Sequence, residues 1–209
     1  MARRLQLILL LVSLLAPATL RAAAKVPVRL RGGIEWGCSQ HLWRHFHLNY
    51  LTEANARVDS QGSQWQPATG AQAGIYAGVL LSRSWEADLT AQYCGIWEDR
   101  RVFPVNLRLV HYFGSSDKDS LIKAFSQGGP VISNNFNMLP SWLVKGGIGR
   151  RKMLGERMSL DLSLSLQMCF DHPEHNIYDP RHDYHVNQQK ALRNNSTYAS
   201  CCVDLSLNF

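Results

Sequence analysis

Residues 198–209 read YASCCVDLSLNF, and apolar and polar side chains alternate along them. The odd positions from Ala199 to Phe209 are apolar or nearly so, and the even positions from Ser200 to Asn208 are mostly polar. A period of two is typical of a β-strand with one apolar and one polar face. The sequence ends on an aromatic residue, where a soluble protein usually has a frayed, polar terminus. We therefore expect this strand to close a sheet.

The same alternation recurs along the chain, most clearly in residues 158–170, which read MSLDLSLSLQMCF. Every even position there is apolar, a pattern that a helix would smear around its circumference. In all, the pattern predicts eight strands, at residues 28–43, 71–81, 85–96, 102–113, 121–132, 142–153, 158–170 and 198–209.

The connections between these strands differ in length. Those after the second, fourth and sixth strands are short turns, whereas residues 44–69 and 171–197 are predicted to be long polar loops. Short turns at one end and long loops at the other are typical of up-and-down barrels in an outer membrane. The predicted fold class is all-β: one eight-stranded antiparallel up-and-down transmembrane β-barrel, formed by residues 25–209.

The amino-terminal residues predict export. Arg3 and Arg4 precede an apolar run from Leu5 to Leu15, and Ala22 and Ala24 form an A-x-A cleavage signal. The apolar run is too short for a membrane helix, which needs roughly 20 residues, so residues 1–24 are predicted to be a signal peptide. Removing its three arginines lowers the formal charge from +6 to +3, and we expect no nucleic-acid partner.

Alternation does not say which face is buried, and a secreted lipocalin-like barrel that binds an apolar ligand is the main alternative. Strands of about 12 residues favour the membrane, because a tilted crossing needs about 9–11. The polar face carries both charge signs, which can pair inside a narrow lumen and plug it; its charged residues are Arg29, Arg31, Glu35, Glu86, Asp88, Arg108, Asp161 and Asp204.

Aromatic residues gather at both ends of the predicted strands, as expected where strands meet the two membrane interfaces. Those at the turn end are Trp85, Phe113 and Phe209, and those at the loop end are Trp97, Phe103, Trp142, Phe170 and Tyr198. The expected location is therefore the outer membrane, with membrane lipids as partners.

Taken together, these features resemble the small OmpA/OmpX-like, porin-family outer-membrane β-barrels of Gram-negative bacteria. The resemblance covers residues 25–209 and rests on the signal peptide, the eight amphipathic strands, the alternating connection lengths and the terminal VDLSLNF. It implies that Phe209 is an assembly signal recognised by the barrel-insertion machinery. Because the family includes stabilisers, adhesins, channels and enzymes, the resemblance does not fix an activity.

Histidines are concentrated in the predicted loops. His172, His175, His182 and His185 form two H-x-x-H pairs in residues 171–197. Neutral imidazoles can bind zinc, copper or haem iron, so metal or haem capture is one hypothesis and a solvated polar loop is the other.

The sequence allows more than one pairing of its cysteines, and it also allows an enzymatic activity. The five cysteines allow Cys169 to bridge Cys202, or Cys38 to bridge Cys201, and leave at least one thiol unpaired. A lipid-acyl hydrolase or transferase would draw on Asp171, His172 or Ser133, but no serine–histidine spacing stands out.

These observations predict a non-catalytic protein without a cofactor. Its function is structural or is interaction with a surface ligand, through residues 44–69 and 171–197.

Overall fold

The computed structural model describes residues 29–97, 100–113, 120–132, 141–155, 158–172 and 177–209. Its strands are β1 Arg29–Leu51, β2 Arg57–Leu80, β3 Trp85–Trp97, β4 Arg100–Tyr112, β5 Ser120–Ile132, β6 Trp142–Met153, β7 Ser159–Asp171, β8 Ile177–Asp179, β9 Tyr184–Val186 and β10 Ala191–Asn208. Within these ranges, no helix is long and apolar enough to cross a membrane. The predicted signal peptide lies outside the described residues.

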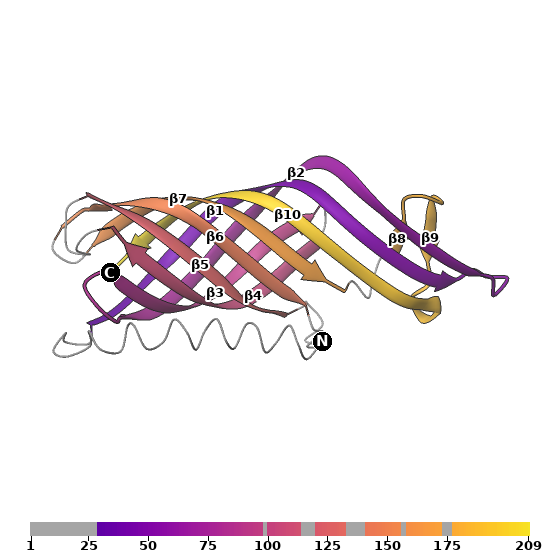
Figure 1. The fold of residues 1–209 in the computed structure, drawn as a ribbon, viewed down its shortest axis with the longest axis horizontal. Helices are drawn as coiled ribbons and strands as arrows, with labels where there is room; N and C mark the ends of the chain where they lie inside the picture. The colour runs from indigo at the N-terminus through magenta and orange to yellow at the C-terminus, as the bar shows by residue number, and fades with distance from the viewer. Residues whose placement is uncertain (1–28, 98–99, 114–119, 133–140, 156–157, 173–176) are drawn as a thin grey trace.

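Eight of these strands form a closed barrel in the order β1-β10-β7-β6-β5-β4-β3-β2. All neighbours are antiparallel, and β1 pairs with both β2 and β10, so the sheet has no edge around its circumference. The last residues of β2, β4 and β6 lie at the end of the barrel where the carboxyl terminus lies (Figure 1). The predicted eight-stranded up-and-down barrel is therefore confirmed, and by its short turns this end faces the periplasm.

Phe209 pairs with Gly32 of β1 at the periplasmic end of the barrel. Its backbone N–H donates to the Gly32 carbonyl at 2.9 Å, and its own carbonyl accepts from the Gly32 N–H at 3.2 Å. The aromatic side chain points outward and is 61% exposed.

We expect deletion of Phe209 to reduce the amount of folded protein in the membrane, because it removes two closing hydrogen bonds and an interfacial aromatic ring. Membrane fractions can be compared by immunoblot, with Phe209→Tyr as the matched control. Normal levels of the deletion variant would exclude an assembly role for this residue.

The outward face of the barrel is an apolar belt. Large side chains are more than half exposed on several strands, among them Ile75, Leu107, Ile148, Leu162 and Leu166. Exposed apolar area of this extent is unfavourable in water and is expected against lipid. Of the aromatic residues predicted at its rims, Phe103, Phe113, Trp142, Phe170 and Phe209 are exposed, whereas the Trp97 side chain lies outside the described part.

The interior is filled by paired charges. Arg108 lies 2.7 Å from both Asp88 and Glu35, and Arg151 binds Asp161 through two hydrogen bonds of 2.8 and 2.9 Å. Further pairs are Lys123–Asp161, Lys145–Asp204 and Arg31–Glu86. The predicted charged lumen is confirmed except at Arg29, which is exposed at the start of β1. An interior of this kind does not suit the lipocalin-like alternative, which requires an apolar cavity.

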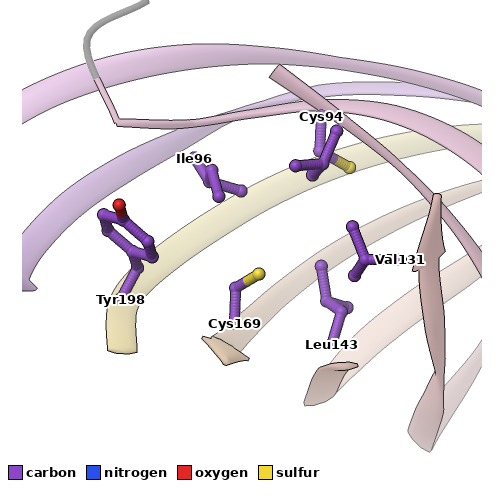
Figure 2. Packing of buried hydrophobic residues seen from close by; sticks show 7 residues of the cluster. Cys94, Ile96, Val131, Leu143, Cys169 and Tyr198 are labelled. Atoms are coloured by element: carbon purple, nitrogen blue, oxygen red, sulfur yellow. The ribbon is translucent and has the colours of Figure 1, made fainter. Parts of the chain in front are cut away.

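A layer of buried apolar side chains lies inside the barrel, on the loop side of these charges. Six strands contribute to this cluster, whose members are Cys94, Ile96, Val102, Val131, Leu143, Cys169 and Tyr198. The labelled side chains in Figure 2 point toward one another. The prediction that Tyr198 lies at the lipid interface was wrong, because even-numbered residues of β10 face the interior and Tyr198 is only 3% exposed.

Candidate functional site

Three strands continue beyond the barrel as an open sheet, which we call the extension. β1 and β2 stay paired as far as Leu51 and Arg57, and β10 stays paired with β1 back to Ala191. In contrast, β3 pairs with β2 only as far as Gln72. Figure 1 shows these three strands projecting far past the others. The prediction of polar loops at residues 44–69 and 171–197 was wrong, because much of both segments is strand.

A bulge in β1 explains why the sequence pattern of residues 44–69 does not predict the strands found there. The register of β1 shifts between His41 and Trp43 relative to both neighbours, so that even-numbered residues turn inward beyond it. Phe46 and Leu48 are therefore buried, while His45 and His47 lie on the outer face. Outside the membrane the outer face meets water, so the polarity of the two faces is also reversed.

The β8–β9 hairpin covers the inner face of the extension. Ile177 and Val186 from the hairpin join Phe46, Leu48 and Tyr50 in one buried apolar cluster. The Tyr184 ring stacks on Tyr50 with centroids 5.8 Å apart. This hairpin, which we call the cap, supplies the apolar burial that a three-stranded sheet needs to be stable outside the barrel.

A buried carboxylate fixes the cap to the strands. Asp179 accepts hydrogen bonds from Ser60 at 2.8 Å and Tyr50 at 3.0 Å, and its side chain is fully buried. It also accepts from the Arg181 backbone N–H at 3.0 Å and lies 2.7 Å from His182 Nδ1. Burial raises the pKa of Asp179, but these hydrogen bonds outweigh it and hold the pKa below its ordinary value. Burial and the bond to Asp179 raise the pKa of Tyr50 to about 12.

One edge of the extension has backbone groups with which no described strand pairs. Thr52 N–H donates to the Ala56 carbonyl at 2.9 Å, and hydrogen-bonded pairs alternate from there along an antiparallel ladder. The residues of β2 that point their N–H and C=O groups away from β1 are thus Arg57, Asp59, Gln61, Ser63 and Trp65. No described strand pairs with β2 on that side before Gln72. Pro67, which has no N–H, ends this free edge.

The described histidines of the predicted metal site contact different partners. His172 Nδ1 is 2.8 Å from the amide of Asn195, whereas His182 contacts Asp179 and the His185 ring packs on Tyr178 at 5.0 Å. His175 lies outside the described residues. In the part of the chain that is described, no group of three or more histidine, cysteine or acidic side chains is arranged to hold a metal ion, so the metal site stays a prediction.

All five cysteines are free thiols. The register explains why neither suggested bridge forms, since Cys169 lies opposite Tyr198 rather than Cys202, and Cys38 lies opposite Val203. Three of the thiols, at Cys94, Cys169 and Cys202, are buried in the lumen.

The residues considered for an enzyme have structural contacts. Asp171 accepts two hydrogen bonds from Arg100, at 2.8 and 3.1 Å, and one from Ser141 at 3.0 Å. His172, the next residue, contacts Asn195. Ser133 lies outside the described residues.

The barrel, its apolar belt and its paired interior charges define an integral outer-membrane β-barrel protein. A closed barrel satisfies the backbone hydrogen bonds of its strands inside a bilayer, and the belt presents the matching surface to lipid. The predicted location in the outer membrane agrees with this architecture.

No protein-family model matches the sequence, and no curated protein matches it. Among solved structures, the chain is similar to Neisserial surface protein A, with 8% identity, coverage of 86% of this chain and 98% of that chain, and a TM-score of 0.43. It is also similar to the outer membrane protease OmpT from Escherichia coli, with 7% identity, coverage of 90% and 99%, and a TM-score of 0.43. The NanC porin has 8% identity, coverage of 83% and 98%, and a TM-score of 0.29. With TM-scores this low, these similarities carry no argument about activity.

Proposed function

We propose that this protein is a non-catalytic surface-interaction barrel, which binds an extended polypeptide at the free edge of β2 while its lumen stays sealed. The observation that carries the proposal is the edge from Arg57 to Trp65, with which no described strand pairs, on a sheet whose inner face the cap covers. Proteins normally cover or blunt such an edge, because its backbone groups pair readily with another strand. Strand addition is an established mode of peptide recognition.

The chemistry of the edge supports a polar partner. Asp59, Gln61 and Ser63 present exposed side chains on the same residues whose backbone groups pair with no described strand; Asp59 also contacts His47, and Ser63 contacts His45. A bound strand would gain main-chain hydrogen bonds from alternate residues and side-chain contacts with these polar groups. The sealed lumen, with its charge pairs and apolar layer, supports a role without conduction.

The proposal also includes a family for this chain, the small OmpA/OmpX-like barrels. Eight strands and a plugged interior support placing the chain with the small OmpA/OmpX-like barrels, exported by a signal peptide at residues 1–24 and inserted through recognition of Phe209. The contacts of Asp171 and His172 with neighbouring side chains support a role without catalysis.

A proline scan of the edge tests the proposal. We expect Gln61→Pro to abolish peptide capture, because proline removes an edge N–H that β1 does not use and is tolerated on edge strands. Gln61→Ala keeps that N–H and is the matched control. The measurement is phage panning of a random dodecapeptide library on the barrel in nanodiscs, followed by binding of the selected peptides to both variants. If no peptide is enriched, or if the enriched peptides bind Gln61→Pro normally, the edge is not the binding surface.

A further inference from the structure

The edge of β2 from Arg57 to Trp65 is symmetric about Gln61. Five of its residues point their backbone groups away from β1, and no described strand pairs with them; they are Arg57, Asp59, Gln61, Ser63 and Trp65. In an antiparallel ladder, two such residues directly opposite each other exchange both of their hydrogen bonds. Two copies of this edge that lie antiparallel, with Gln61 opposite Gln61, therefore pair all five residues of each copy. A shift of this register by two residues pairs only four.

Each end of such a pair has an exposed indole. Trp65 is 78% exposed and packs on Trp43, with ring centroids 6.4 Å apart. In this register Trp65 lies opposite Arg57 of the second copy. The Nε of Arg57 donates to Asn49 of its own chain at 3.0 Å, which keeps the guanidinium over β1 and leaves the aliphatic stem to cover the indole. Pairing thus removes a large aromatic side chain from water at both ends.

The charges of the edge also suit this register. Asp59 contacts His47 through Oδ1, and its side chain is still 60% exposed. In the pair Asp59 lies opposite Ser63, whose hydroxyl can donate to the carboxylate. Neither Arg57 nor Asp59 faces the same residue of the other copy, so no like charges lie opposite each other.

The symmetry of the pair decides how the two barrels are oriented. Its two-fold axis runs between the two Gln61 residues, perpendicular to the sheet. The extension continues the wall of the barrel along the long axis of the molecule (Figure 1), so the two-fold axis is perpendicular to the barrel axis. Rotation about it turns the second barrel end for end. Two copies in one membrane point the same way, so this pair forms only between two membranes. A symmetric parallel pair is not an alternative, because the bonds of a parallel ladder are slanted to the residues on either side of the one opposite.

We propose that the edge of β2 binds the same edge of a second copy whose barrel lies in an opposing membrane. The inference rests on the proposed function and names its polypeptide partner. Both copies contribute the same surface, and a two-fold contact of this kind closes after two copies. The extension thus links two membrane surfaces by binding to itself.

The test is clustering of phosphatidylcholine vesicles that carry the barrel, in an equal mixture of donor-labelled and acceptor-labelled vesicles. We expect energy transfer to rise with protein content, and protein-free vesicles to show none. Gln61→Pro should abolish the transfer and Gln61→Ala should keep it, because proline removes an edge N–H at the centre of the pair. Transfer that persists in Gln61→Pro, or no transfer with the wild type, would overturn the proposal.

A charge exchange checks the register. Ser63→Asp places carboxylates opposite each other twice in the pair, and we expect the association to weaken about tenfold. Mixing these vesicles with Asp59→Lys vesicles should restore it, because the new carboxylate then meets the new ammonium. Heat-modifiable gel mobility verifies that each variant is folded. Failure of this rescue would contradict the pairing of Asp59 with Ser63 and overturn the proposal.

The outcomes separate this inference from the proposed function. If peptides selected by panning bind the edge while wild-type vesicles stay apart, the partner is another polypeptide, and only the pairing of two copies is overturned. If neither peptide binding nor clustering depends on Gln61, both are overturned.

Discussion

Replacing Arg108 by alanine is expected to lower the free energy of unfolding of the barrel by about 3–5 kcal/mol, the usual cost of breaking a buried ion pair from one side. Arg108 lies 2.7 Å from both Glu35 and Asp88, and it stacks over the Tyr76 ring at 4.3 Å. Its removal leaves two carboxylates buried without their cation. Urea titration of the barrel in phospholipid vesicles, followed by tryptophan fluorescence, measures the loss.

A variant that removes the charges together provides the control. In Arg108→Met combined with Glu35→Gln and Asp88→Asn, no unpaired charge is left in the lumen, and we expect most of the lost stability to return. Arg108→Lys keeps the charge but loses the two-pronged contact, and should fall between alanine and wild type. An alanine variant as stable as the wild type would show that these contacts do not hold the barrel together.

The second large effect is expected at Asp179. Asp179→Asn should release the cap, because the buried carboxylate accepts hydrogen bonds from β1, β2 and the hairpin itself. Hydrogen bonds to a charged group contribute about 1.5–3 kcal/mol each, so amide exchange in β8 and β9 should accelerate on the order of 100-fold. Hydrogen–deuterium exchange of the barrel in detergent measures this rate.

Asp183→Asn is the matched control, since it makes the same chemical change four residues away. Asp183 accepts a bond from Tyr178 at an exposed position and has a positive φ of 49°, which asparagine tolerates. Its exchange rates should stay near those of the wild type. Equal acceleration in both variants would mean that the cap is not fixed through Asp179.

The pKa of Asp179 also predicts how the cap responds to pH. Its folded-state pKa lies below the ordinary 3.8, so its stabilisation is fully present above that value and is lost as pH falls through the folded pKa. The pKa of Tyr50 is raised from 10.0 to about 12, so its contribution is fully present below pH 10 and is lost as pH rises from there through about 12. The cap is therefore expected to stay closed across the neutral range.

The barrel itself could be predicted from the sequence, because its strands lie between lipid and a polar interior. The contrast between these two surroundings forces strict alternation, as in residues 158–170, and the observed β7, Ser159–Asp171, agrees within one residue. β6 was likewise predicted at its observed bounds, Trp142–Met153. Glycine at position 147 of β6 allows close packing against β7, since a side chain there would collide with the Leu164 carbonyl.

The extension could not be predicted in the same way. Beyond the bulge after His41 the two faces exchange roles, and water replaces lipid outside, so residues 44–69 look polar and irregular. Asp179 bonds to Ser60 and Tyr50, which lie 119 and 129 positions away from it in the chain, so no local sequence pattern predicts these contacts.

The central claim is that lipid, and not water, covers the outward face of the barrel. Trp36, Trp85 and Trp142 stand on that face, and Trp36 and Trp142 are 41% and 52% exposed. The most direct test is the tryptophan emission of the wild-type protein reconstituted into vesicles with increasing fractions of lipids brominated on their acyl chains. Emission is predicted to fall steadily as the brominated fraction rises. Emission that does not depend on bromination, with the protein recovered in the aqueous phase, would contradict a membrane-spanning barrel.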